Sequence, residues 1–176
     1  MAAAESQVGP EEFRHLMGRW ATGVSVVTAH ENGRDVGLTV NALLSVSLHP
    51  PTLLVSLMTE ADSTPVIERT GKFGVSVLAA DQRSMSERFA EAIPAERKFV
   101  GLSVLRGSTG VALLPGAAGH LECEVERMIP AADHHLIVGR VVALASGPDG
   151  LPLLFYRGRY GESATADSLR LPPGRP

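Results

Sequence analysis

Short apolar runs rich in β-branched residues recur along most of the chain, and turn residues separate them. Runs of about four to eight such residues, bounded by Gly, Pro, Asn or Asp, are typical of strands. We therefore expect strands within residues 23–30, 37–51, 52–58, 72–78, 120–129, 134–145 and 151–158. Asn32 and Gly33 predict a hairpin turn after the first of these, since both residues tolerate positive φ.

Three segments have helical patterns. The first begins at Pro10 and places four apolar residues on one side: Phe13, Leu16, Met17 and Trp20. The second follows the possible caps at residues 62–64 and is expected to end near Gly71, and the third is expected to be capped by Asp81. The glycine-rich residues 101–119 predict a loop with one short strand.

Strands outnumber helices and do not alternate with them regularly, which argues against a parallel α/β sheet. The pattern favours a mainly β fold, a closed antiparallel barrel with short peripheral helices. The 176 residues fit one domain. We expect that domain at residues 10–161, with flexible termini at 1–9 and 162–176.

Composition narrows the possible partners. The net charge of −3 arises from interspersed charges, so no nucleic acid and no anionic membrane is expected as a partner. Cys123 is the only cysteine, which excludes an intrachain disulfide and favours a reducing compartment. The chain shows no signal-peptide pattern and no apolar run of about 18 residues, so we expect a cytoplasmic protein that binds a small molecule.

The segment 37–51, GLTVNALLSVSLHPP, sets small polar residues in an apolar run. If it is extended throughout, they share one side of the strand, with Leu43 interrupting the series: Thr39, Asn41, Ser45 and Ser47.

Several common motifs are missing. The chain has neither a GxGxxG dinucleotide fingerprint nor a GxSxG nucleophile elbow. His134 and His135 are adjacent in an expected strand and so point in opposite directions, which argues against a metal site.

Three short motifs each leave two interpretations open. Asp133 and His134 are either a proton-handling pair or a solvated strand end. The loop ERKF, residues 96–99, either binds a phosphate or is a surface turn. The segment FYRGRY, residues 155–160, either grips an anionic ligand with a ring or belongs to a subunit contact.

Taken in order, seven segments resemble the flavin reductase-like family, the FMN-binding split barrels that serve as the small reductase component of two-component flavin-dependent monooxygenases. They are ATGVSVVTA (21–29), GLTVNALLSVSLHPP (37–51), FGVSVLA (73–79), RKF (97–99), LECEV (121–125), DHHLIVGRV (133–141) and PLLFYRGRY (152–160).

The resemblance implies two sets of site residues. Its flavin-binding positions correspond to Thr39, Val40, Asn41, Ala42, Ser45, Ser56, Leu57, Ser63, Lys98 and Phe99. Its nicotinamide-binding positions correspond to His134, Tyr156, Arg157 and Gly158. His134 is the expected catalytic residue: it either orients the nicotinamide, which we favour, or assists proton balance at the flavin. The chain departs from the family at Arg97, where the family usually has an acidic residue before the lysine.

The resemblance also implies a homodimer in which NADH or NADPH reduces FMN or FAD, and reduced flavin then passes to a partner monooxygenase. Two alternatives remain at this stage. One is a split barrel that binds flavin or haem without turnover, and the other is an enzyme that reduces a corrinoid or another acceptor through a tightly held flavin.

Overall fold

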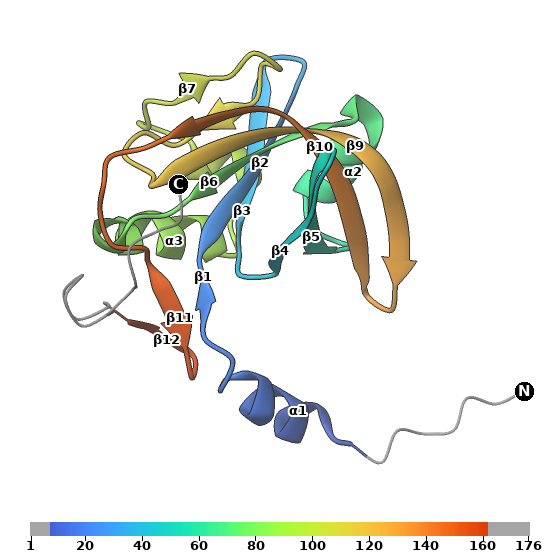
Figure 1. Ribbon diagram of the computed structural model, residues 1–176, viewed down its shortest axis with the longest axis vertical. Helices are drawn as coiled ribbons and strands as arrows, with labels where there is room; N and C mark the ends of the chain where they lie inside the picture. The colour runs from blue at the N-terminus through green and yellow to red at the C-terminus, as the bar shows by residue number, and fades with distance from the viewer. Residues whose placement is uncertain (1–7, 162–176) are drawn as a thin grey trace, which may run out of the picture.

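The computed structural model describes residues 8–161, so most of the two termini expected to be flexible, residues 1–7 and 162–176, lies outside the described residues. Seven strands form one antiparallel sheet in the order β3-β2-β6-β9-β10-β5-β4 (Figure 1). Their bounds are β2 Ser25–Glu31, β3 Arg34–Val40, β4 Leu43–Leu48, β5 Pro51–Met58, β6 Lys72–Val77, β9 Gly119–Ala131 and β10 His134–Ser146. The expected mainly β fold is confirmed.

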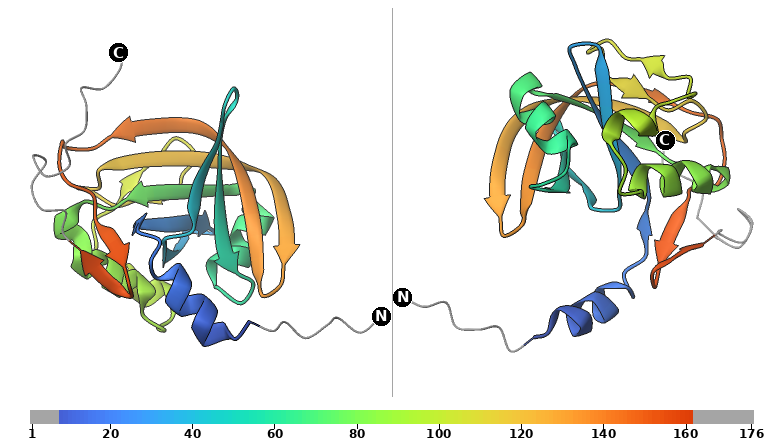
Figure 2. Two further views of the ribbon diagram at one scale, coloured as in Figure 1. Left: turned by 60° about the horizontal axis from the view of Figure 1, so that its bottom comes forward. Right: turned by 180° about the vertical axis from the view of Figure 1, so that it is seen from behind.

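Smaller elements surround this sheet. Strands β1 (Thr22–Gly23), β11 (Leu154–Tyr156) and β12 (Arg159–Gly161) form a three-stranded sheet. The helices are α1 (Pro10–Met17), α2 (Ser63–Thr70), α3 (Arg83–Ala90) and the single turn α4 (Ala95–Lys98), with a 3₁₀ turn at Ala80–Gln82 before α3. Figure 2 shows α1 apart from the other helices, beside the β11–β12 pair.

The large sheet does not close into a barrel within the described residues. Its edge strands are β3 and β4, and no ladder joins them. The chain leaves β3 after Val40, crosses at Asn41 and Ala42, and pairs as β4 with β5 at the opposite edge. The predicted closed barrel is therefore not observed. Strands β3 and β4 are consecutive in the chain but lie at opposite edges of the sheet, which a count of strands cannot reveal.

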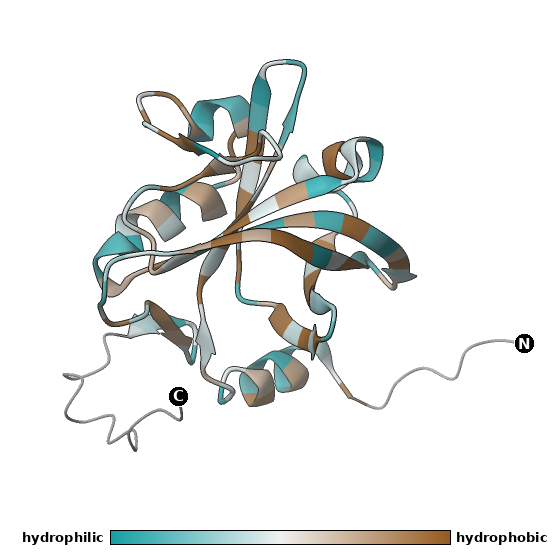
Figure 3. Cartoon of the chain, turned by 45° about the horizontal axis from the view of Figure 1, so that its top comes forward, coloured by the Kyte–Doolittle hydropathy of each residue, from teal (hydrophilic) through white to brown (hydrophobic). Residues whose placement is uncertain are grey.

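The curved sheet encloses an aliphatic core. Val27, Val55, Phe73 and Ile137 are all fully buried and belong to one cluster. Gly139 of β10 is required here, because a Cβ at this position would lie 2.5 Å from the ring of Phe73. Figure 3 shows brown, hydrophobic bands along the strands of the sheet, interrupted by paler and teal ones.

Local predictions had mixed outcomes. Asn32 and Gly33 form the expected turn with φ angles of 51° and 78°, and Gly71 ends α2 with φ of 65°. Asp81 is not the cap of α3: it lies inside the 3₁₀ turn, and Gln82 is at the N-cap position. Residues 96–99 do not form a loop either, since Glu96 to Lys98 belong to α4.

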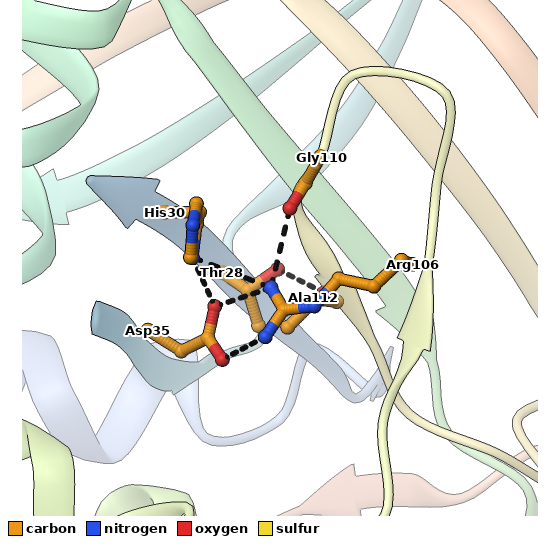
Figure 4. Close-up of polar contacts among 6 residues, drawn as sticks. All are labelled: Thr28, His30, Asp35, Arg106, Gly110 and Ala112. Atoms are coloured by element: carbon orange, nitrogen blue, oxygen red, sulfur yellow. Dashed lines mark hydrogen bonds and ion pairs between the residues drawn. The ribbon is translucent and has the colours of Figure 1, made fainter. Parts of the chain in front are cut away.

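Residues 101–119 contain two short strands rather than one, β7 (Leu105–Arg106) and β8 (Ala112–Leu113), which pair with each other. Two carboxylates attach this hairpin to the body. Asp35 accepts two hydrogen bonds of 2.6 Å from the guanidinium of Arg106 (Figure 4). Buried Glu122 accepts backbone N–H bonds from Ser108 and Thr109 at 2.9 and 2.6 Å. Because the partners in these hydrogen bonds are far apart in the sequence, no local sequence pattern predicts them.

Candidate functional site

A cleft of about 700 Å³ lies where the chain crosses from β3 to β4, and we call it the sheet cleft. Its floor includes Asn41, Ala42 and Ser56. Apolar side chains of α1 and of the following residues form another wall: Phe13, Met17 and Trp20. The volume lies within the range of about 300–1,000 Å³ that is typical of small-molecule sites.

Thr22 also lines the sheet cleft, and its Oγ1 is the one buried side-chain oxygen or nitrogen without a hydrogen-bond partner among residues 8–161. A buried hydroxyl with no partner costs roughly 1–3 kcal/mol, so such groups in native proteins call for an explanation. Rotation of the side chain about χ1 would turn this hydroxyl toward a polar ligand in the cleft, which would then supply the missing partner. The sequence prediction missed Thr22 because an isolated threonine before a β-branched run is an ordinary strand residue.

The 37–51 segment does not present the single polar face that a continuous strand would give. It breaks at Asn41–Ala42, and a register shift lies between Ser45 and Ser47. Thr39 is turned toward α3, where its Oγ1 donates a 2.6 Å hydrogen bond to the carbonyl oxygen of Ser86.

The remaining strand residues of the predicted flavin set point in different directions. The side chains of Val40 and Leu57 lie in the core at 7% and 1% exposure, so only their backbone atoms are left for a ligand. Ser45 is exposed on the edge strand β4 and does not line the sheet cleft.

The helical residues of the predicted flavin set lie away from the sheet cleft. Ser63 is buried at the start of α2. Buried Lys98 donates a 3.0 Å hydrogen bond from Nζ to the carbonyl oxygen of Phe89, and Phe99 packs edge-on against the Phe89 ring at 5.0 Å. Burial lowers the pKa of Lys98, although the carboxylates of Asp62 and Glu91 oppose the shift.

His134 is the first residue of β10, and its Cα is paired with Met58. Residues opposite each other in an antiparallel pair share a face, and so do residues two apart in one strand. His134 therefore lies on the same face of the sheet as Ser56, which is two residues before Met58 in β5. Its Nδ1 is 2.7 Å from Oδ1 of Asp133. This hydrogen bond lowers the pKa of the Asp133 carboxyl.

The other predicted nicotinamide residues are close to α1. Arg157 and Gly158 form the left-handed turn between β11 and β12, and the Arg157 N–H donates a 2.8 Å hydrogen bond to the carbonyl oxygen of Gly18. The Arg157 guanidinium lies 5.2 Å from the centre of the Tyr156 ring. Arg157 and Gly158 line a second cleft, of about 560 Å³.

The structure thus groups Asn41, Ala42 and Ser56 with Thr22 in the sheet cleft, and Arg157 with Gly158 in the second cleft. It does not bring Ser63, Lys98 or His134 to either cleft in a single chain. No group of three or more His, Cys, Asp or Glu side chains suited to a metal occurs in the part of the chain that is described.

The comparison with known families decides the assignment. The family described as flavin reductase like domain matches residues 17–164. The chain belongs to this family. The sequence-based family assignment is therefore confirmed.

Two relatives and one solved structure illustrate the likeness. An NADH-dependent flavin reductase from a Rhodococcus species is 44% identical over 161 residues, which cover 89% of this chain and 88% of the relative. The reductase subunit HsaB of a flavin-dependent monooxygenase from Rhodococcus jostii (strain RHA1) is 35% identical, with 90% of this chain and 80% of HsaB covered. The NADH:FAD oxidoreductase SgcE6 of Streptomyces globisporus superposes with a TM-score of 0.85 at 31% identity, covering 94% of this chain and 99% of SgcE6.

Proposed function

We propose that this protein is an NAD(P)H-dependent flavin reductase that binds FMN or FAD in the sheet cleft. The observation that carries the proposal is the orphan hydroxyl of Thr22, which shares the cleft with the polar side chains of Asn41 and Ser56. These groups suit the polar edge of an isoalloxazine ring, and the apolar walls suit its faces. Family membership and the names of the relatives support the same activity.

In this proposal the chain's residues bind and orient. Thr22, Asn41 and Ser56 fix the ring by hydrogen bonds, while Trp20 and Leu44 keep water from it. The bound flavin supplies a ring that accepts a hydride from nicotinamide. The rate then depends on holding the two ligands in contact in the correct orientation.

His134 is proposed to orient the nicotinamide carboxamide, with Asp133 fixing the direction of the imidazole through Nδ1. Its place on the same sheet face as Ser56 supports this role. Ser63, Lys98 and Phe99 are proposed to act near the flavin phosphate, where the N-terminus of α2 and a lysine ammonium both favour an anion. Thr39, Val40, Ala42, Ser45 and Leu57 remain proposed flavin contacts on the resemblance alone.

A homodimer is proposed as the working state. Apolar side chains remain exposed on and just after α1 and on strands β4, β5 and β9 of the described chain: Phe13, Leu16, Trp20, Leu44, Met58 and Ile129. Scattered apolar exposure is normal, but a set this large is typical of protein contacts.

In the same proposal the open sheet, in which β3 approaches β5, is the split barrel of the family.

We further propose that a flavin-dependent monooxygenase receives the reduced flavin and that the protein works in the cytoplasm. The likeness to HsaB, named as a reductase subunit, supports the first proposal. None of the helices in residues 8–161 has the length and apolar character needed to cross a bilayer.

The direct test is steady-state oxidation of NADH or NADPH under air with FMN or FAD in excess. We expect turnover in at least one of the four combinations, and their ranking gives both preferences. If none of them exceeds the rate without protein, the proposed function is wrong. Flavin that stays bound through gel filtration without turnover would favour a binding protein instead.

A further inference from the structure

The second cleft carries concentrated positive charge, and we call it the arginine cleft. It lies between α1 and the β11–β12 turn and is lined by Glu11, Arg14, His15, Arg19 and Arg157, with Gly18 and Gly158. Three arginines and a single acidic residue therefore line this cleft. This local excess contrasts with the net charge of −3 for the whole chain.

The three guanidiniums have no carboxylate partner within residues 8–161. Five other arginines are each paired with an acidic side chain: Arg34, Arg69, Arg83, Arg106 and Arg140. Arg14 lies in the last turn of α1, where a cation also interacts favourably with the helix dipole. Arg19 and Arg157 lie outside the helix, so that explanation does not extend to them.

The cleft has a fixed wall. The backbone hydrogen bond from Arg157 to Gly18 joins the β11–β12 turn to the end of α1. The Arg157 guanidinium lies 5.2 Å from the centre of the Tyr156 ring, although Tyr156 itself does not line the cleft. Guanidiniums bind phosphate oxygens in pairs. The three arginines together are therefore suited to a phosphate or a pyrophosphate.

The arginine cleft and the sheet cleft share the end of α1 as a boundary. Gly18 and Arg19 line the former, whereas Met17 and Trp20, their neighbours in the chain, line the latter. We propose that Arg14 and Arg19, together with Arg157, form the phosphate subsite for the nicotinamide dinucleotide. This inference rests on the proposed function, because the hydride donor is the dinucleotide that must reach the flavin.

The test measures KM and kcat for NADH in Arg14→Gln and Arg19→Gln. Arg69→Gln on α2 is the matched control, since it removes the same charge away from the cleft. We expect each cleft variant to raise KM about three- to tenfold, between the effects of exposed and buried charged contacts, with kcat within about twofold. The control should keep the KM of the unmodified protein. An unchanged KM in both cleft variants would overturn the inference.

Further donors and acceptors separate the possible phosphates. Reduced nicotinamide riboside has no phosphate, so its KM should be insensitive to the substitutions. A larger effect with NADPH than with NADH would place the 2′-phosphate in the cleft. If the variants instead raised the KM for FAD and not for NADH or NADPH, the cleft would bind the flavin's adenylate, and the inference would be wrong.

Calorimetry of ADP-ribose binding to the flavin-free protein distinguishes failure of the proposed reductase activity from failure of the proposed phosphate subsite. Absence of turnover with intact ADP-ribose binding would refute the reductase but not the anion site. Turnover without any ADP-ribose binding, or binding that Arg19→Gln leaves unchanged, would refute the subsite alone.

Discussion

Thr22→Val should have opposite effects on the stability of the flavin-free protein and on flavin affinity. Valine has nearly the shape of threonine but lacks the hydroxyl, which in the free protein is buried without a partner. Removing it abolishes a desolvation penalty of roughly 1–3 kcal/mol, so the free energy of unfolding should rise by about 1 kcal/mol or more. Flavin binding should lose one hydrogen bond, about 0.5–1.5 kcal/mol, which is a rise in Kd of about two- to tenfold.

Thr28→Val is the matched control. Thr28, like Thr22, lies in a strand and has a buried hydroxyl, but its Oγ1 donates a hydrogen bond to the carbonyl oxygen of Ala112 (Figure 4). The same chemical change there leaves a buried carbonyl without its partner, so unfolding should become easier by roughly 1–3 kcal/mol. Flavin affinity should not change, because Thr28 does not line the sheet cleft.

Urea unfolding of the flavin-free proteins and flavin titration by fluorescence measure the two quantities. The reasoning fails if Thr22→Val destabilises the free protein as Thr28→Val does, because the hydroxyl would then have a partner in solution. It fails also if Thr22→Val leaves the Kd of both FMN and FAD unchanged.

Three more predictions follow from side chains outside the sheet cleft. His134→Ala should raise the KM for nicotinamide or slow hydride transfer, whereas unchanged kinetics would remove His134 from the site. Lys98→Ala should weaken FMN by about 1–3 kcal/mol more than riboflavin if the ammonium binds phosphate, and equal losses would contradict this. Burial opposes ionisation of Asp35, but hydrogen bonds from Arg106 and His30 outweigh it and lower its pKa below the usual 3.8. That stabilisation is present above pH 3.8 and is lost as the pH falls through the lower folded pKa, so urea titrations should show a steeper acid loss than in Asp35→Asn.

Local patterns predicted the parts of the fold that depend on neighbouring residues. The turn at Asn32–Gly33 and the helix end at Gly71 need positive φ, and the residues that tolerate it are visible in the sequence. The apolar run at residues 120–129 correctly predicted a strand, which extends over Gly119–Ala131 in the structure. The predicted cap of α3 was wrong because a 3₁₀ turn over Ala80–Gln82 precedes the helix and contains Asp81, so that Gln82 takes the N-cap position.

The candidate site was less accessible to sequence reasoning because it forms where distant segments meet. Thr22, Asn41 and Ser56 are separated by tens of residues, and only the pairing of β4 with β5 brings the last two to one cleft. The resemblance supplied Asn41 and Ser56 through matched motifs. It did not supply Thr22, whose significance is an unsatisfied hydrogen bond and therefore a property of the folded chain.

The same crossing that opens the sheet also explains why the polar residues of segment 37–51 have different roles. A continuous strand would have kept Thr39, Asn41 and Ser45 on one face. The break at Asn41–Ala42 leaves Thr39 bound to Ser86 on α3, and Ser86 in turn donates a 2.9 Å hydrogen bond to the hydroxyl of Tyr160 on β12. Thr39 thus ties the strand that leads into the sheet cleft to the strand pair that carries Arg157. A chain that must hold two ligands in contact needs such a link between the elements proposed to bind them, which gives this polar segment a positioning role as well as a binding one.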